Sequence, residues 1–463
     1  MCLKKKPPSV KCLCEQTLTI TQRVKTEARM RLTVKLAQVE LKRGKESITG
    51  RMGLGWVKHC AEDFGIKRMV EAEYAKGKSH KRGIEPWKKV MSGVMMMLSG
   101  GERVEDIEVL RADEGLLESL GWEGMSCPDT MLNFISSRRN NGRNRKVNER
   151  VVIESLKRIE QEELTYDNDA TFLDSKKKSA EYSYQKRKQF SGLIGCIAEL
   201  GIINTVDYRR GNVSPQTGIL NQLRKAIEQA KRAGKRIVNF RSDSAGYQDK
   251  IISGCEKEGI KWYITVDQNE GIKKLIFRRK VTDWKTMYGA YKERDDTQWT
   301  QAEYVVSKGY KIRVLILKWK NRNPDLFNSG EYCYHVIGTN NREIDPMEWL
   351  EFHNGRMGTI EHINKEIKSG LGCSYTPSHE FEKNRGYFVM GVLAYNILAM
   401  MKLFYFEGLQ KLWTIKTVRY YFINVCGKIV KSGRKFYCQI VNVTNEIYAL
   451  FRYCKSRLGQ CYY

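Results

Sequence analysis

The chain has 463 residues, and its 81 Lys and Arg outnumber its 53 Asp and Glu to give a formal charge of +28 at pH 7. A hydrophobic content of 41% and an aromatic content of 10% exclude an intrinsically disordered chain and indicate a globular protein of about two to four structural units. A charge this positive favours a polyanionic partner, above all nucleic acid, over a ribosomal-type or merely solubilising basic surface.

Residues 1–150 are predicted to form a basic, mainly helical region that binds DNA or forms a dimer. Residues 1–50 hold 12 Lys and Arg against 4 Glu, and the alternation at 31–36 predicts a strand. Apolar residues then recur at helical spacing through 51–135, and a turn at 126–130 starts a new helix near Pro128. The cationic stretch 138–146 is interpreted as a linker or a phosphate-contacting arm, with a solvated face as an equal alternative.

From residue 151 the pattern changes to alternating strands and helices. Strands are predicted at 164–173, 193–200, 202–208, 236–243 and 262–267, with helices at 215–233 and 247–258. Three strands, a helix, a strand, a helix and a strand are the order expected of an RNase H-like sheet. Residues 151–267 are therefore predicted to form the first part of an RNase H-like core.

The rest of the chain divides into three predicted regions. Residues 268–345 form a β-rich insertion with strand-like runs at 311–319 and 332–338, and 346–405 return to helix as the second part of the core. Residues 406–463 form a small basic region with a hairpin turn near 431–435. The apolar stretch 389–404 is interpreted as a buried helix, because Tyr395, Asn396 and Lys402 interrupt it. The predicted fold class is α/β.

Thirteen Cys are scattered along the chain without a Cys-x-x-Cys pair. Their odd number and spacing argue against a disulfide framework and a structural zinc site. His353, His362 and His379 do not form a metal-ligand spacing either, and we interpret them as surface or DNA-facing side chains. The N-terminal residues contain no apolar run long enough for a signal peptide. We expect a cytoplasmic protein with no membrane contact.

Three acidic residues lie in short, distinctive phrases: Asp169 in Asp-Ala-Thr (169–171), Asp243 in Arg-Ser-Asp-Ser-Ala-Gly-Tyr (241–247) and Glu361 in Gly-Thr-Ile-Glu-His-Ile-Asn-Lys (358–365). The predicted elements place Asp169 on the first strand, Asp243 at the carboxyl end of the fourth, and Glu361 on a later helix. Carboxylates are the natural holders of Mg²⁺, and two such ions about 4 Å apart assist phosphoryl transfer. The trio therefore predicts a site for two Mg²⁺ or Mn²⁺ ions.

Each acid also has a simpler alternative. Asp167 shares one face of the strand with Asp169 and is a rival ligand, as is Asp174. Asp243 can cap the helix that starts near Ser244. Glu361 can pair with Lys365 one helical turn away.

These phrases carry a specific resemblance. The chain is similar to the DDE transposases of bacterial insertion sequences, of the transposase DDE domain group 1 kind. Residues 164–171 and 240–247 resemble the first and second aspartate motifs, and 352–368 resembles the Tyr-Arg-Glu-Lys signature around the catalytic glutamate. The resemblance extends over roughly residues 50–435 of the chain. Phe352 stands where the signature has tyrosine, and a shorter-spaced match would put Asn354 there instead.

The resemblance implies that Asp169, Asp243 and Glu361 bind two metal ions and catalyse DNA cleavage followed by strand transfer. It implies that Arg356 and Lys368 hold DNA phosphates, and we expect Arg241 to contact DNA as well. It further implies that an aromatic residue of the insertion stacks on a flipped base, with Trp299, Trp319 and Trp284 as candidates and core packing as the alternative. The expected partners are double-stranded DNA, at the inverted repeats of the element ends and at the target, and a second copy of the chain.

Two other functions remain open on the sequence. One is a non-catalytic or repurposed DNA-binding descendant of a transposase, although all three acids are present. The other is an RNase H-like nuclease that cuts without joining. Inverted repeats beside the gene distinguish a transposase from the DNA-binding descendant. A strand-transfer assay distinguishes a transposase from the nuclease.

Overall fold

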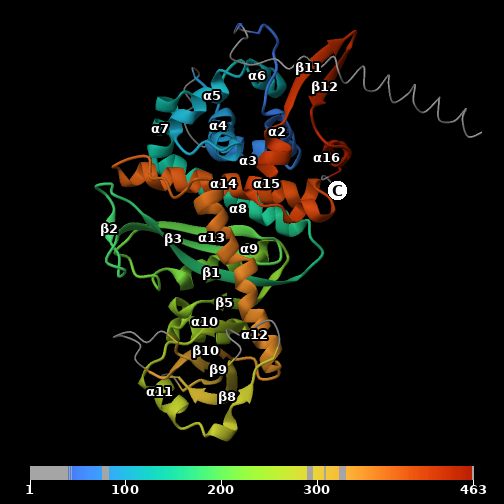
Figure 1. Ribbon diagram of the computed structural model, residues 1–463. Coiled ribbons are helices and arrows are strands. Elements are labelled where there is room, and N and C mark those ends of the chain that lie inside the picture. Colours follow the sequence, from blue (N-terminus) through green and yellow to red (C-terminus); the bar gives the residue numbers. More distant parts are fainter. Residues whose placement is uncertain are drawn as a thin grey trace, which may run out of the picture. The chain divides into compact units, whose positions relative to one another are not determined.

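The computed structural model describes residues 40, 42, 44–75, 83–288, 296–306, 309–322 and 330–460. The chain divides into two units, Met1–Glu46 and Ser47–Tyr463. The few described residues of the first unit form no helix or strand, and the strand predicted at 31–36 lies outside the described residues. The second unit is a mixed α/β structure built around one large mixed sheet (Figure 1).

The N-terminal part of the second unit is helical, as predicted. Its helices are α2 (Met52–Asp63), α3 (Ile66–Ala75), α4 (Pro86–Ser99), α5 (Ile107–Arg111), α6 (Glu114–Leu120), α7 (Pro128–Ser136) and α8 (Arg138–Lys157). Helix α7 begins at Pro128, where proline costs no hydrogen bond. Several of them pack on α14 (Phe381–Tyr405), which approaches α7 so closely that a Cβ at Gly386 would lie 2.0 Å from the Ile135 carbonyl oxygen.

The prediction of a linker or arm at 138–146 is wrong, because these residues begin α8. Ser137 caps the helix by accepting a hydrogen bond from the Asn140 N–H. Asn141, Asn144 and Asn148 then follow one another at helical spacing and are all buried. They bond to distant groups, as the Tyr74 hydroxyl donates to Asn144 Oδ1 and Asn148 donates to a carbonyl oxygen of the sheet. The buried stripe is polar, so an apolar periodicity does not reveal it.

The central sheet follows the predicted order of elements. Strands β1 (Glu163–Asp174), β3 (Lys188–Ile197) and β4 (Ile202–Arg210) are antiparallel, and β5 (Arg236–Ser242) and β6 (Lys261–Thr265) run parallel to β1. Helices α9 (Ile219–Arg232) and α10 (Asp249–Glu258) connect them. The spatial order is β4-β3-β1-β5-β6, with the short β2 (Glu181–Tyr182) also paired to β3.

Alternate residues of β1 face opposite sides of the sheet. Tyr166 and Asn168 point toward α9, where both contact the Gln222 side chain. Asp167 and Asp169 point to the other face, toward α13 (Ile360–Lys365) and the turn before it. One face of the strand therefore belongs to the core, and the other carries the acidic residues.

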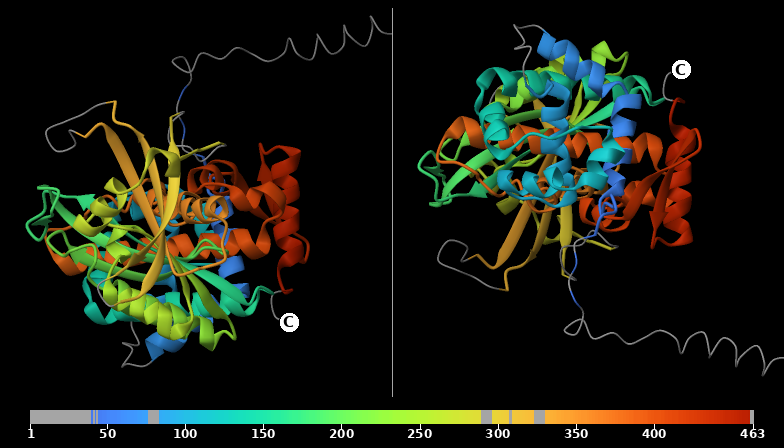
Figure 2. Two further views of the ribbon diagram at one scale, coloured as in Figure 1. Left: turned by 90° about the horizontal axis from the view of Figure 1, so that it is seen from below. Right: turned by 90° about the horizontal axis from the view of Figure 1, so that it is seen from above.

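Residues 268–345 are rich in strands, as predicted, but they continue the central sheet. They form α11 (Glu270–Phe277), β7 (Lys285–Thr286), β8 (Gln298–Val305), β9 (Lys311–Lys320) and β10 (Tyr332–Thr339). Strand β10 pairs antiparallel with β6, through Ile337 opposite Thr265 and Thr339 opposite Tyr263. In Figure 2 the yellow and gold strands of this segment cross the front of the molecule in the view from below.

The C-terminal part contains α12 (Pro346–Asn354), α13, one wide turn at Glu366–Gly370, α14, the short α15 (Ile415–Val418) and α16 (Asn445–Arg457). The predicted hairpin is present as β11 (Cys426–Ser432) and β12 (Lys435–Val441), with Gly433 in the left-handed region at φ +61°. Helix α16 is not among the predicted elements. Helix α14 has the length and composition of a membrane span, but 83% of its most apolar stretch is buried inside the protein.

Candidate functional site

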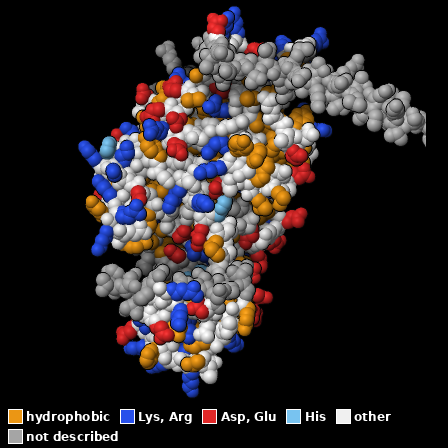
Figure 3. All heavy atoms as spheres, in the orientation of Figure 1, with side chains coloured by type: hydrophobic (Ala, Val, Ile, Leu, Met, Phe, Trp, Pro, Cys, Tyr) orange, Lys and Arg blue, Asp and Glu red, His pale blue; other side chains and the backbone are white. Residues whose placement is uncertain are grey.

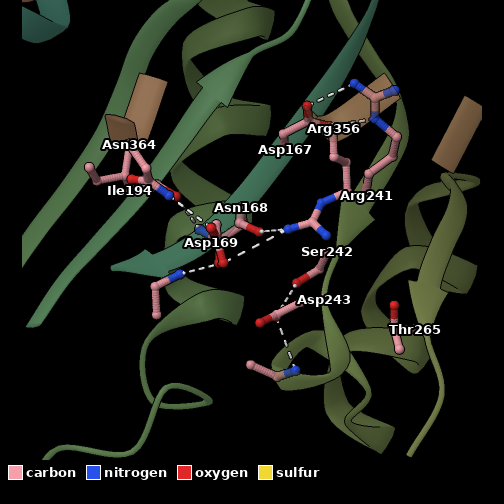
Figure 4. A network of polar contacts seen from close by, with 12 residues as sticks. Asp167, Asn168, Asp169, Ile194, Arg241, Ser242, Asp243, Thr265, Arg356 and Asn364 are labelled. Atoms are coloured by element: carbon pink, nitrogen blue, oxygen red, sulfur yellow. Dashed lines mark hydrogen bonds and ion pairs between the residues drawn. The ribbon is translucent and has the colours of Figure 1, made fainter. Parts of the chain in front are cut away.

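Two of the three acids lie side by side at the centre of the sheet. Strands β1 and β5 are parallel neighbours, with Asn168 opposite Ser242. Asp169 follows Asn168 on β1, and Asp243 follows Ser242 directly after the end of β5, so both lie just beyond the last paired residues of two strands that are about 4.8 Å apart. Figure 4 shows both side chains at this edge, where β5 ends and β1 continues. The sequence-based placement of Asp169 and Asp243 is confirmed.

Asp169 is mostly buried and is held by three groups. Its Oδ1 accepts a hydrogen bond from the Ala170 N–H at 2.9 Å, and its Oδ2 accepts one from Asn364 Nδ2 at 2.8 Å (Figure 4). The Arg356 guanidinium lies 3.9 Å from Oδ1. The carboxylate is therefore fixed in orientation, and among the described residues Arg356 is the one cation that offsets its charge.

Asp243 has the capping role that the sequence offers as its alternative. It precedes the short 3-10 turn Ser244–Gly246, and its Oδ1 accepts a hydrogen bond from the Ala245 N–H at 3.1 Å. The Ser242 hydroxyl also contacts Oδ1, at 3.4 Å. Capping uses one carboxylate oxygen and leaves the other to a ligand.

Glu361 lies in the first turn of α13 and is exposed. Asn364, which bonds Asp169, follows it by three residues and so lies on the same side of the helix. In the described part of the chain, Glu361 forms no ion pair with Lys365. The helix therefore presents Glu361 toward the aspartate pair, and the alternative role as a surface ion pair is not observed.

The three carboxylates influence one another electrostatically. Burial raises the pKa of Asp169 from 3.8 to about 6, while Arg356 and the Ala170 N–H oppose the rise and the charges of Asp243 and Glu361 add to it. Among the described residues, no three Asp, Glu, His or Cys side chains form a closed metal-ligand cluster. The trio thus lies within electrostatic range without a complete ligand shell.

Asp167, the rival ligand, is fully occupied by a structural role. It is completely buried, and the Arg241 guanidinium bonds both of its oxygens, with Nε to Oδ1 at 2.6 Å and Nη2 to Oδ2 at 2.7 Å. The Thr359 hydroxyl also donates to Oδ2. These bonds leave no oxygen for a metal ion, so the geometry favours Asp169 over Asp167.

The expectation that Arg241 contacts DNA is wrong, because its side chain is buried in the pair with Asp167. Its guanidinium lies 4.8 Å from the Phe352 ring and donates to the Phe352 carbonyl oxygen. Phe352, which replaces the tyrosine of the signature, therefore packs against the arginine that holds Asp167. Its own ring meets Tyr263 edge-on at 4.7 Å.

The two remaining basic candidates are placed differently. Arg356 is 5% exposed, and it contacts Asp169 and the Asn168 carbonyl oxygen rather than solvent. Lys368 is half-exposed and lines a cavity of about 440 Å³ together with β1 residues that follow Asp169. Of the two, Lys368 is therefore the predicted phosphate contact that reaches a cavity.

The tryptophans of the inserted segment also separate into two groups. Trp299 and Trp319 are half-buried and pack against a small apolar cluster that includes Leu315, Leu317 and Trp349. Trp284 instead lines a cavity of about 490 Å³ with Lys318, whose Nζ lies 4.1 Å from the indole centre. All three tryptophans thus pack against apolar clusters, and Trp284 also borders a cavity.

His353 is buried rather than on the surface, contrary to the interpretation of the sequence. Its Nε2 lies 3.3 Å from the Thr265 hydroxyl. Burial lowers the pKa of His353 from 6.5 to about 3, with the charges of Arg356 and Arg241 and the neighbouring His335 also acting against protonation. The ring is therefore neutral in the folded protein across the physiological range.

The neutral His353 ring makes the protein sensitive to acid. Because the folded-state pKa lies below the ordinary 6.5, the unfolded chain takes up a proton first, and stability falls as the pH drops below 6.5. Between pH 7 and pH 5 we expect His353 to account for a loss of about 2 kcal/mol in the free energy of unfolding. In urea unfolding between pH 7 and pH 5, the His353→Gln variant should therefore lose about 2 kcal/mol less of its free energy of unfolding than the wild type.

At pH 8 the ring is neutral in both states, so the difference between His353→Gln and the wild type there measures packing alone. NMR signals of the His353 ring that titrate near pH 6.5 in the folded protein would contradict the prediction.

Three residues at the site lie outside the sequence-based prediction. Asn364 orients Asp169, the Thr359 hydroxyl donates a hydrogen bond to Asp167, and the Asn168 carbonyl oxygen accepts one from Arg356. The signal for Asn364 is its position three residues after Glu361, on the same face of the helix. Thr359 and Asn168 have no comparable signal, because their partners come from distant parts of the chain.

The donor set fits a hard divalent cation. Three carboxylates with one nearby guanidinium carry excess negative charge, and mutual repulsion contributes to the raised pKa of Asp169. A cation relieves that repulsion, and Mg²⁺ and Mn²⁺ prefer oxygen ligands of this kind. The buried Asn364 Oδ1 lacks a hydrogen-bond partner and adds a further oxygen beside Asp169.

The family model described as "Transposase DDE domain group 1" matches residues 32–461. No curated protein matches the chain at a significant level. Among solved structures, the cryo-EM structure of the piggyBac transposase synaptic complex with hairpin DNA has a TM-score of 0.43 and 9% identity, over 88% of this chain and 80% of that chain.

Proposed function

The chain belongs to the transposase DDE domain group 1 family, and on that premise we propose that it cuts DNA at the ends of an insertion sequence and joins them to target DNA. The family implies a DNA-cutting and DNA-joining enzyme in general. The observation that carries the finer proposal is the placement of Asp169 and Asp243 just beyond the last paired residues of neighbouring strands, with Glu361 in electrostatic range.

The architecture supports an RNase H-like core. The strands lie in the order β4-β3-β1-β5-β6, with three antiparallel strands followed by two parallel ones. We propose that residues 151–267 and 346–405 form this core, that 268–345 is its insertion, and that the basic segments 1–150 and 406–463 contact DNA or the partner copy. The acids lie at the carboxyl end of β5, where ligand sites of open α/β sheets form.

Asp169, Asp243 and Glu361 would hold divalent cations, Mg²⁺ or Mn²⁺, in the proposed reaction. When bound, two such ions neutralise charge at the phosphate and activate a water or a 3′-hydroxyl. The protein's own groups prepare this site. Asn364 fixes the orientation of Asp169, and Arg356 limits the repulsion among the three carboxylates.

Substrate contacts follow from the groups that reach open space. Lys368 lies on the continuation of the helix that carries Glu361 and lines the cavity beside β1, so we propose that it binds a phosphate next to the reacting one. Trp284, with Lys318 over its ring, is placed to stack on an unpaired base, in preference to Trp299 and Trp319. Joining two ends at once calls for a homodimer on double-stranded DNA, and such a protein acts in the bacterial cytoplasm at the nucleoid.

The proposed function is tested with the purified chain and a linear DNA that carries the sequences flanking its gene. We expect cleavage at the inverted repeats and transfer of the new 3′ ends into a second DNA when Mg²⁺ is present. EDTA should stop both reactions. Cleavage should also decline as the pH falls through about 6, because Asp169 then takes up a proton that competes with the cation.

Two outcomes would favour the alternatives. Cleavage without any joined product indicates an RNase H-like nuclease. Specific binding of the flanking sequences without cleavage, with Mg²⁺ or Mn²⁺, indicates a DNA-binding descendant of a transposase.

A further inference from the structure

A second basic surface lies next to the candidate site and is not used by it. The segment between β1 and β3, residues 175–188, reads Ser-Lys-Lys-Lys-Ser-Ala-Glu-Tyr-Ser-Tyr-Gln-Lys-Arg-Lys and holds six cations against one acid. We call it the lysine-rich loop. Figure 3 shows Lys and Arg side chains gathered on the side of the molecule where Figure 1 places β2, which lies within this loop.

Three exposed cations of the loop have no acidic partner among the described residues. Arg187 pairs with Asp174, and the one acid of the loop, Glu181, pairs with Arg210. Lys176, Lys178 and Lys186 are exposed and form no ion pair with the described residues. Three uncompensated positive charges on one loop favour a polyanionic partner.

Two aromatic side chains project among these lysines. Tyr182 and Tyr184 are 68% and 70% exposed, although tyrosine rings are usually at least half-buried. Tyr184 is held edge-on against Phe172, with ring centres 5.5 Å apart. A tyrosine in such a position can donate its hydroxyl to a phosphate and lay its ring against a sugar, as happens in protein–DNA interfaces.

The loop is anchored to the body of the protein. Its start is tied by a hydrogen bond of 2.8 Å between the Ser175 and Thr376 hydroxyls, and the Lys178 N–H donates to His379 Nδ1. Its tip is a tight turn in which the Ser183 N–H donates to the Arg187 carbonyl oxygen, with Lys186 in the left-handed region at φ +58°. The lysines therefore project from a fixed surface.

The loop also shares a cavity with the β1 residues that follow Asp169. One cavity of about 440 Å³ is lined by β1 residues 170–174, by Gln185 and Arg187 of the loop, and by Lys368. Strand β1 runs five residues from Asp169 to Asp174, where the loop begins, which corresponds to about 17 Å at 3.4 Å per residue. The same length is the rise of about five base pairs along the axis of duplex DNA.

We propose that the lysine-rich loop binds the backbone of duplex DNA about five base pairs from the phosphate that reacts at Asp169 and Asp243. The inference rests on the proposed function, because it takes the acidic trio as the place of reaction. Lys368 contacts the backbone between the two positions, and Lys176, Lys178 and Lys186 contact it beyond the cavity. The loop thereby sets the direction in which DNA leaves the site.

The test compares two triple variants of the full chain that lose the same charge. Lys176→Gln/Lys178→Gln/Lys186→Gln changes the loop, and Arg224→Gln/Lys250→Gln/Lys257→Gln changes exposed cations of α9 and α10. Binding to a labelled duplex of random sequence, about 30 base pairs long, is measured across a salt series, because phosphate contacts do not depend on sequence. Equal melting temperatures of the wild type and both variants establish that each variant is folded.

We expect the loop variant to lower the slope of log K against log salt by about 2 to 3, and to weaken binding at least tenfold at about 0.1 M salt. The α9–α10 variant should keep the wild-type slope. In a hydroxyl-radical footprint on the flanking DNA, the loop variant should lose protection about five base pairs from the cleavage position.

An unchanged slope for the loop variant, or an equal loss in both variants, overturns the inference while leaving the proposed function intact. The same holds if the loop variant binds DNA normally but alters association of the chain with itself, since the loop would then be a protein interface. A wild-type chain that fails to bind or cut DNA overturns the proposed function itself.

Discussion

Asp243→Asn should reduce Mg²⁺-dependent DNA cleavage by about a thousandfold or more while leaving DNA binding nearly intact. Asp243 directly follows the strand that neighbours Asp169, so removal of its charge takes away one of two adjacent carboxylates for the cation. The asparagine can still accept the hydrogen bond from the Ala245 N–H, because Asn and Asp cap helices about equally well. The change therefore separates the ligand role from the capping role.

Asp243→Ala removes both roles and provides the comparison. It should be as inactive as Asp243→Asn, and in addition less stable by about 1 kcal/mol because the cap is lost. Asp345→Asn makes the same chemical change at a residue that caps α12 and should keep wild-type cleavage. Cleavage is followed on DNA with the flanking sequences, and binding by gel shift in the absence of metal. Full cleavage by Asp243→Asn would show that this carboxylate is not a ligand.

Asp167→Ala should destabilise the folded protein by about 3–5 kcal/mol, the cost of leaving a buried charge without its partner. Asp167 is fully buried, and Arg241 is 5% exposed, so water does not replace the lost carboxylate. Arg241 would lose the acceptors of both its Nε and Nη2 hydrogen bonds. The free energy of unfolding in urea measures the effect, and an unchanged dependence on urea concentration confirms that the same folded state is compared.

The control replaces both partners by apolar side chains of similar volume. Asp167→Leu/Arg241→Met should recover most of the lost stability, since a well-packed apolar pair avoids the uncompensated charge. Asp169→Asn, two residues along the same strand, should not destabilise the protein at neutral pH, because the carboxyl it removes is disfavoured there in its charged form. A loss below about 1 kcal/mol for Asp167→Ala would mean that the pair does not hold the sheet in the way described.

The strands and the acidic trio could be predicted because their signals are local. Alternation and short turns locate β1, β3 and β4, and the strand-to-helix turn at Asp243 follows from its own neighbours in the sequence. Parallel pairing of β1 and β5 then brings Asp169 and Asp243 together without further information.

The choice between Asp167 and Asp169 could not be made from the sequence. It depends on Arg241, 74 residues away, which occupies both oxygens of Asp167. The burial of Arg241 and Arg356 could not be predicted for the same reason. In a basic chain, the neighbouring residues in the sequence look the same whether an arginine side chain faces DNA or a buried carboxylate. The helix at 138–146 was missed for a related reason, since asparagines form its buried face and find their partners in other elements.

The pairing of β10 with β6 determines how the inserted segment can move. Ile337, Gly338 and Thr339 are bonded in register to Thr265, Ile264 and Tyr263, and β6 in turn pairs with β5, which leads to Asp243. A sheet resists sliding and hinging between bonded strands, so the Trp284 cavity keeps a constant separation from the acids. In the proposed function, the DNA would then have to bend to reach both places, and bending a site of about 20–30 base pairs costs about 1–6 kcal/mol.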